Sequence, residues 1–171
     1  DEAHGAHFTF SRLYPQTALE SGADGVINGL HKTLPVFNQG ASLHLSARLA
    51  GDSRIAKSLS LLTTTSPSYP ILASIELARQ FMEENGESIL EKSYQLSQEY
   101  RQKINAITGL NCCEQELQAV AGVTGLDPLK MLVSVRGSSL DGYQFAALLR
   151  ERYGIQVELE GTNFILAMFS L

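Results

Sequence analysis

A long stretch of helical periodicity in the middle of the chain most constrains how this sequence can fold. The pattern predicts two helices, Ile71–Glu84 and Ser88–Ile107, separated at Asn85 and Gly86, which are poor helix formers. Before this stretch, short strand-like runs alternate with helical ones. After it, two strands follow closely behind a helix. We therefore expect an α/β layer, then a long connecting helix, then a smaller α+β unit.

The first part of the chain contains two predicted strands, Gly25–Asn28 and Ala41–Ala47, and the second of these alternates partly between apolar and polar residues. A proline in the first turn favours a short helix at Pro15–Glu20. A second helix is predicted over Ser53–Leu62, with its first residue as the N-cap. The two prolines of Thr63–Pro70 predict a loop or an extended segment there.

The second part of the chain is read as strands and one helix. Strands are predicted at Met131–Val135, Ile155–Leu159 and Asn163–Phe169. A helix is predicted at Leu140–Tyr153, ending at Gly154.

Composition excludes several classes of protein. The 171 residues are 44% hydrophobic, which is enough for a buried core. The formal net charge of −5 argues against a nucleic-acid partner. No apolar run approaches the roughly 20 residues that a membrane helix needs. Cys112 and Cys113 are adjacent and provide no disulfide framework, so we expect a cytoplasmic protein.

Two polar clusters could carry chemistry: Asp1–His7, and His31–Leu34 directly after a predicted strand. Taken singly, each cluster is weak evidence of a functional site, since most such residues are solvated. We expect no metal site, because Gly5 disfavours the helix that would align the neighbouring histidines. Together they place a carboxylate after one presumed strand and Lys32 after the next. In an open α/β sheet, both would lie at the carboxyl edge, where ligands bind. Pyridoxal phosphate chemistry needs such a pair: a lysine for the Schiff base, and an acid that keeps the pyridine nitrogen protonated.

Five motifs follow one another in the chain: DEAHGAHF (1–8), ALESGAD (18–24), HKTLP (31–35), QGASLH (39–44) and TTTSPSYP (63–70) with LAS (72–74). In order and spacing, this series resembles the signature of the Orn/Lys/Arg decarboxylases, which are fold-type I, pyridoxal-phosphate-dependent enzymes. The resemblance covers at least residues 1–80 and continues more loosely through Gly154–Leu159. It implies that residues 1–107 are the C-terminal part of a transferase-like, α/β large domain that binds the cofactor and ends in a connecting helix. Residues 108–171 would then be a smaller, incomplete α+β C-terminal domain.

The resemblance also implies roles for residues in the two clusters. Lys32 would form the Schiff base with pyridoxal 5'-phosphate, and Asp1 would pair with the pyridinium nitrogen. Ala3 would pack against the ring face. His31, a catalytic residue beside the lysine, and His4 would lie near the cofactor.

The implied reaction is decarboxylation of arginine, lysine or ornithine to an amine and carbon dioxide, as in polyamine metabolism. The family assembles as homodimers or larger oligomers with active sites shared between subunits. Ser66 lies in the loop that would reach the neighbouring subunit's site, where it is a candidate phosphate or substrate contact. We also expect the chain to be a piece of a longer protein, because its first residue is itself a proposed cofactor ligand.

Two other hypotheses stay open, and a departure from the family pattern motivates the second of them. The family has serine or threonine in the two residues before the His-Lys pair, and this chain has Gly29 and Leu30. One alternative is a different fold-type I reaction, catalysed by an aminotransferase or another lyase. The other is an inactive family member with a regulatory or scaffold role.

Overall fold

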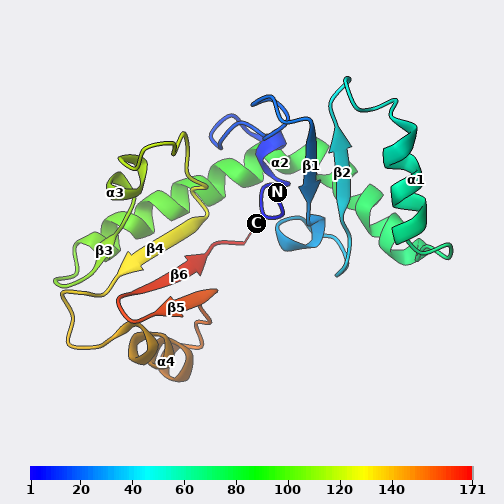
Figure 1. Ribbon diagram of the computed structural model, residues 1–171. Coiled ribbons are helices and arrows are strands. Elements are labelled where there is room, and N and C mark those ends of the chain that lie inside the picture. Colours follow the sequence, from blue (N-terminus) through cyan, green and yellow to red (C-terminus); the bar gives the residue numbers. More distant parts are fainter. Residues whose placement is uncertain (171) are drawn as a thin grey trace. The chain divides into compact units, whose positions relative to one another are not determined.

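The computed structural model describes residues 1–170 of the chain (Figure 1). These residues form two compact units. Unit 1 comprises Asp1–Arg12 and Gln16–Ile89, and unit 2 comprises Leu13–Pro15 and the chain from Leu90 onward. The structure is mixed α/β, as the sequence predicts. The domain boundary at residue 107 stays a prediction.

Unit 1 contains a two-stranded antiparallel sheet, in which β1 (Gly25–Asn28) runs beside β2 (Ser42–Leu45) (Figure 1). Both strands lie where the sequence predicts them. Val26 and Asn28 are buried, whereas Ile27 between them is exposed, as the alternating geometry of a strand requires.

Two short 3-10 helices frame the site in unit 1. The first, η1, spans Phe8–Phe10, and the second, η2, spans Leu30–Lys32 directly after β1. The helix predicted at Pro15–Glu20 does not form: residues 15–17 have no regular secondary structure, and residues 18–20 form a turn. Its geometry is set by Glu20, whose carboxylate accepts hydrogen bonds from the backbone N–H of Thr17 at 3.0 Å and from its hydroxyl at 2.9 Å.

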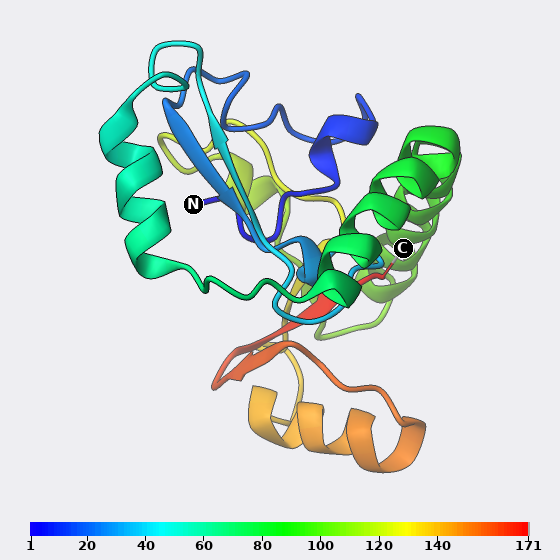
Figure 2. The ribbon, with the colours of Figure 1, turned by 90° about the vertical axis from the view of Figure 1, so that its right-hand side faces the viewer.

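Helix α1 has the predicted bounds, Ser53–Leu62, but a different cap. The N-cap is Asp52, because its carboxylate accepts a hydrogen bond from the backbone N–H of Arg54 at 2.9 Å. Figure 2 shows α1 and the loop that leads from it into the next helix.

The two helices predicted on either side of Asn85 and Gly86 are one continuous helix, α2, of 37 residues (Tyr69–Asn105). Gly86 is buried at a close approach: a Cβ there would lie 3.1 Å from the Cε of Met82 and 3.2 Å from the Cβ of Phe10. Packing of this kind offsets the roughly 1 kcal/mol that glycine costs in a helix. None of the helices described over residues 1–170 is long and apolar enough to cross a membrane.

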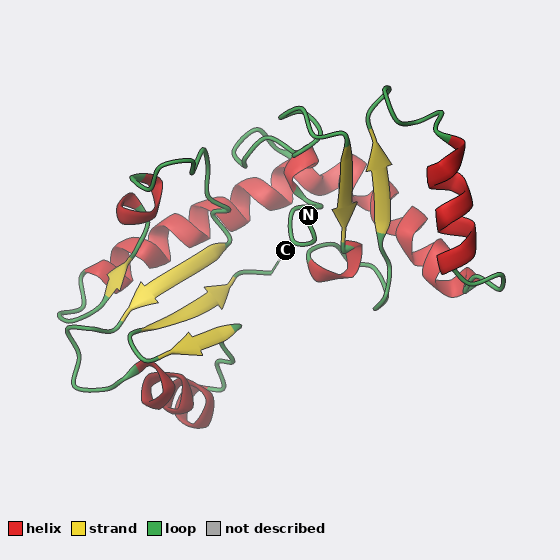
Figure 3. Ribbon diagram, viewed as in Figure 1, coloured by secondary structure: helices red, strands yellow, loops and turns green. Residues whose placement is uncertain are grey.

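Unit 2 is built on a four-stranded antiparallel sheet with the order β3-β4-β6-β5 (Figure 3). The strands are β3 (Asn111–Cys112), β4 (Lys130–Ser134), β5 (Leu159–Gly161) and β6 (Phe164–Met168). A one-turn helix, α3, lies at Gln115–Gln118.

Helix α4 (Gly142–Tyr153) follows β4, and Asp141 caps it through a capping box with Gln144. The strand predicted at Ile155–Leu159 begins only at Leu159. Gly154 ends the helix with a positive φ of 67°, and the N–H of Ile155 still bonds to Leu149, so the first predicted strand residues belong to the helix cap.

The core of unit 2 packs α4 and the sheet together. It contains the buried residues Cys112, Met131, Val133, Ala146, Val157 and Ile165. Beside it, the buried side chain of Arg101 on α2 donates from Nη2 to the carbonyl oxygens of Pro128 at 3.0 Å and Lys130 at 2.7 Å. The hydroxyl of Ser97 donates to the same Pro128 oxygen at 2.8 Å. The polar bonds of these helix residues therefore hold the start of β4.

Candidate active site

The first three residues of the chain run along the last residues of β1. The N–H of Glu2 donates to the carbonyl of Ile27 at 3.0 Å, and the N–H of Gly29 donates to the carbonyl of Ala3 at 3.1 Å. Ladder-like bonds of this kind fix the segment against the end of the strand. They place Asp1 and Ala3 at the point where the chain leaves β1 for Lys32.

Asp1 is exposed, and its orientation is set locally. The N–H of Ala3 donates to Oδ1 of Asp1 at 2.9 Å, which is the geometry of an Asx-turn. The carboxylate is therefore held close to the backbone that β1 anchors, and it stays accessible to a ligand.

Lys32 ends η2, and its stem lies over Gly29. A Cβ placed on Gly29 would be 3.2 Å from the Cδ and 3.4 Å from the Cε of Lys32, and 3.1 Å from the carbonyl oxygen of Ala3. Gly29 thus leaves room for the lysine stem beside Ala3. The glycine that departs from the family pattern has a clear structural consequence, since a larger residue would crowd both neighbours.

His31 is half-buried, and its ring is bonded to Gly40. Its Nδ1 lies 2.9 Å from the carbonyl oxygen of Gly40, and its backbone N–H donates to the same oxygen at 3.3 Å. Because a carbonyl only accepts, Nδ1 carries the proton. In the neutral ring, Nε2 is then the nitrogen that can accept a proton.

The remaining two predicted residues lie in different surroundings. His4 is half-buried in the turn that the N–H of Gly5 closes by donating to the carbonyl of Glu2 at 2.9 Å, so it is adjacent to Ala3. Ser66 lies in the exposed loop between α1 and α2, where its N–H donates to the hydroxyl of Thr64 at 3.1 Å. Within residues 1–170, no hydrogen bond links Ser66 to the Lys32 group, and its role across subunits stays a proposal.

Sequence reasoning did not find two side chains that support this group. Asn28 is only 5% exposed, and its Nδ2 donates to the backbone oxygen of Glu2 at 2.8 Å and to Oε1 of Glu2 at 3.1 Å. The other carboxylate oxygen of Glu2 accepts from the N–H of Ala18 at 2.5 Å. The available signal was an asparagine at a buried position of the alternating strand, immediately before the turn that carries Lys32.

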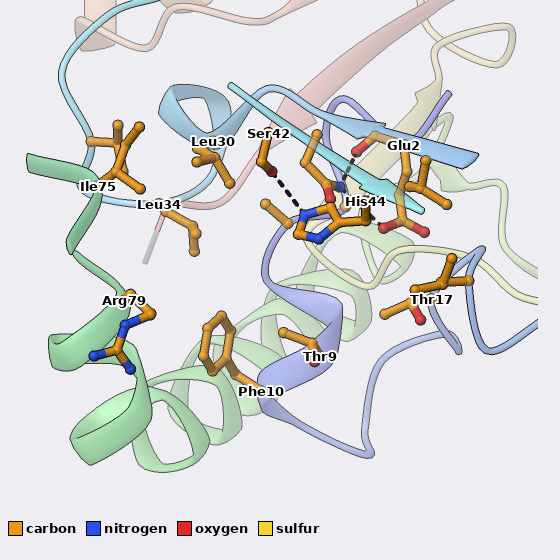
Figure 4. Close-up of a pocket in the computed structure, with 16 residues that line it drawn as sticks. Glu2, Thr9, Phe10, Thr17, Leu30, Leu34, Ser42, His44, Ile75 and Arg79 are labelled. Carbon is orange, nitrogen blue, oxygen red and sulfur yellow. Dashed lines mark hydrogen bonds between the residues drawn. The ribbon is translucent and has the colours of Figure 1, made fainter. Parts of the chain in front are cut away.

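A cavity of about 310 Å³ in unit 1 is lined in part by Asn28 and Glu2 (Figure 4). The sheet residues Val26, Asn28, Ser42 and His44 contribute to its wall, and the Ser42 hydroxyl lies 2.8 Å from Nε2 of His44. Figure 4 labels Glu2, His44, Phe10 and Thr9 among the residues that line the cavity. The lining includes Glu2 but neither Asp1 nor Lys32, so the cavity borders the candidate site without containing its reactive groups.

All 171 residues match the family model described as the major domain of Orn/Lys/Arg decarboxylase. The chain belongs to the Orn/Lys/Arg decarboxylase family. The resemblance found in the motif series is therefore confirmed.

Curated relatives of the family agree with this assignment. The chain is 36% identical to an arginine decarboxylase of Halalkalibacterium halodurans over 99% of its own length and 35% of the relative's. It is 34% identical to an arginine decarboxylase of Bacillus subtilis, with 99% of this chain and 35% of the relative covered. The chain thus spans about a third of the length of these relatives.

Solved structures of family members share the fold. The lysine decarboxylase of Francisella novicida superposes with a TM-score of 0.79 at 23% identity, over 99% of this chain and 29% of that one. The constitutive lysine decarboxylase of E. coli superposes with a TM-score of 0.66 at 20% identity, over 85% of this chain and 25% of that one. The chain therefore shares the mixed α/β fold of these two structures.

Proposed function

We propose that this chain is part of a decarboxylase that acts on a basic amino acid with pyridoxal 5'-phosphate as cofactor. The observation that carries the proposal is the position of Asp1 and Ala3 beside the end of β1, where Gly29 also receives the stem of Lys32. The relatives named arginine decarboxylase and lysine decarboxylase support the reaction and the substrate class.

The side chains at this place fit the cofactor by their chemistry. A primary amine on an exposed side chain, a carboxylate and a small apolar residue are the groups that hold its aldehyde, its ring nitrogen and its ring face. The lysine stem lies over Gly29, and the Lys32 side chain is exposed, so a ligand can reach it. When bound, the cofactor would supply an electron sink for the electrons left on the substrate's α-carbon as carbon dioxide departs.

Each residue has a separate task in this proposal. The Nζ of Lys32 would hold the cofactor's aldehyde carbon, and the same amine is the group placed to carry a proton. The carboxylate of Asp1 would face the protonated ring nitrogen. Ala3 would leave space for the ring. His31, whose Nδ1 is bound to Gly40, presents Nε2 as a base or acid beside the lysine.

The proposal extends to assembly and to substrate. We propose a homodimer or a larger homo-oligomer in which Ser66 reaches the site of the neighbouring subunit, because this residue lies on an exposed loop and, within residues 1–170, has no hydrogen bond to its own chain's Lys32 group. Arginine, lysine and ornithine are all candidate substrates, since the family model that matches the chain is named for all three.

A labelled-substrate assay on the full-length protein tests the reaction. The protein is incubated separately with arginine, lysine and ornithine labelled at the carboxyl carbon, and released carbon dioxide and 2-oxo acid are both measured. We expect carbon dioxide from one of the three, and none from Lys32→Ala. A 2-oxo acid without carbon dioxide would indicate an aminotransferase. No product from any substrate by a cofactor-loaded protein would favour the inactive family member.

A further inference from the structure

We infer that Asn28 and Glu2 form a positioning pair that sets the Asp1–Ala3 segment against Lys32. The inference rests on the proposed function, because it assigns a role toward the same cofactor site. Neither residue is expected to touch the reacting atoms. Their effect would pass through the backbone between them and the residues that hold the cofactor.

Asn28 is the fixed half of the pair. It is the last residue of β1, it pairs with Ser42 of β2, and its side chain is 5% exposed. Both of its observed amide bonds go to one residue, Glu2, at the backbone oxygen and at the carboxylate. A buried amide that donates hydrogen bonds to both the main chain and the side chain of the same residue restrains that residue's position as well as its rotamer.

Glu2 is held from its other side too. Its second carboxylate oxygen accepts from the N–H of Ala18, in the turn that the Thr17–Glu20 hydrogen bonds close. Hydrogen bonds to an ionised carboxylate are stronger than neutral ones. The carboxylate therefore links the strand, through Asn28, to the turn after η1.

This restraint reaches both neighbours of Glu2 in the chain. Asp1 precedes Glu2 and Ala3 follows it, and the Ala3 carbonyl accepts the N–H of Gly29, against which the Lys32 stem packs. A shift of Glu2 would move the carboxylate of Asp1 relative to Lys32. Constellations that act on a substrate must hold within about 0.5 Å of their productive geometry.

The chemistry of the pair explains why an amide is required at this position. Asn28→Asp keeps the shape but removes both donors, so a carboxylate would face the backbone oxygen and the carboxylate of Glu2. In the double variant Asn28→Asp with Glu2→Gln, the introduced glutamine can still accept from Ala18 through its oxygen. Its nitrogen can then donate to the introduced aspartate, which restores the link in reverse.

The test uses the full-length protein in four forms: Asn28→Asp, Glu2→Gln, the double variant, and Ser46→Ala as the control. Ser46 is a matched control because its hydroxyl bonds to Asp24 at 3.3 Å in unit 1, at the other end of the β1–β2 pair. Two properties are measured besides activity: the affinity for pyridoxal phosphate, and the pH at which the visible band of the bound cofactor titrates. We expect Asn28→Asp to bind at least tenfold more weakly and to shift the titration midpoint, the double variant to recover part of both, and Ser46→Ala to change neither.

Parallel measurements on Asp1→Ala and Lys32→Ala separate this inference from the proposed function. If these two lose the cofactor while Asn28→Asp keeps the wild-type affinity and midpoint, the positioning role is wrong and the proposed function stands. If they bind the cofactor normally, the proposed function itself fails. A fall in thermal stability of Asn28→Asp with an unchanged midpoint would also overturn the inference, because it would reveal a purely structural bond. Should Asn28→Asp not fold, Glu2→Gln carries the test, with a shifted midpoint expected and an unchanged one contradicting the role.

Discussion

Arg101 offers a sharp quantitative test of how unit 2 is held together. Its Nη2 donates to the Pro128 and Lys130 carbonyls, and its side chain is almost fully buried. Each hydrogen bond from a charged donor contributes about 1.5–3 kcal/mol, which gives about 3–6 kcal/mol for the two. The buried Nε of Arg101 has no partner within the described residues, and leaving such a group unpaired costs about 1–3 kcal/mol. Replacement by methionine removes both the benefit and this cost, so we expect Arg101→Met to destabilise unit 2 by about 2–3 kcal/mol.

Two further variants separate the contributions to this effect. Nη1 of Arg101 lies 3.7 Å from Oε2 of Glu114, whose side chain is 34% exposed, and such a pair contributes less than about 1 kcal/mol. Glu114→Gln should therefore have a much smaller effect than Arg101→Met. Lys103 is the matched control on the same helix: it is exposed and paired with Glu99 at 2.6 Å, and Lys103→Met should produce no measurable change.

Native-state hydrogen exchange gives the magnitude locally. The amides of β4 should exchange about 30- to 140-fold faster in Arg101→Met than in the wild type, which is the same free-energy difference of about 2–3 kcal/mol expressed as an opening equilibrium. Exchange within about threefold of wild type would refute the reasoning, since it would mean that the two carbonyl bonds make no net contribution to stability.

Three other predictions address α4, α1 and the cysteines. Gly142→Ala should cost about 1–3 kcal/mol in a denaturation measurement, because a Cβ there would overlap carbonyl oxygens of the β5–β6 hairpin. Hydrogen bonds from the side chain and the backbone N–H of Arg54 hold the pKa of Asp52 below its usual value. The stability that these bonds give α1 is present above the unfolded-state pKa of Asp52, and it is lost as the pH falls through the lower folded-state pKa. Amide exchange in α1 should therefore become faster at acidic pH, and Asp52→Asn should remove this pH dependence. Burial raises the pKa of the Cys112 thiol, so iodoacetamide should alkylate half-buried Cys113 well before Cys112 in a time course read by mass spectrometry.

The strands of unit 1 could be predicted because their signals are local. Gly25–Asn28 and the centre of Ala41–Ala47 carry the pattern of a strand within a few residues. The continuity of α2 could not be predicted in this way. Asn85 and Gly86 weaken a helix locally, and the packing of Phe10 from the start of the chain against Gly86 decides the outcome.

In the candidate site, too, some residues could be predicted from the sequence and others could not. Asp1 and Lys32 stand out in the sequence because their residue types and order match a chemistry. The Asn28–Glu2 hydrogen bond joins residues that are 26 positions apart, and the sequence around either residue does not predict its partner. Reactive groups are visible from residue type, whereas the groups that position them are visible only once the chain has folded.

The most direct test of the central claim is to locate the cofactor on the chain. The full-length protein is loaded with pyridoxal phosphate, reduced with borohydride, digested, and analysed by mass spectrometry for the modified lysine. The account predicts a stoichiometric adduct on Lys32 and its loss, together with the visible absorbance band, in Lys32→Ala. An adduct on a different lysine, or an undiminished band in Lys32→Ala, would contradict the account.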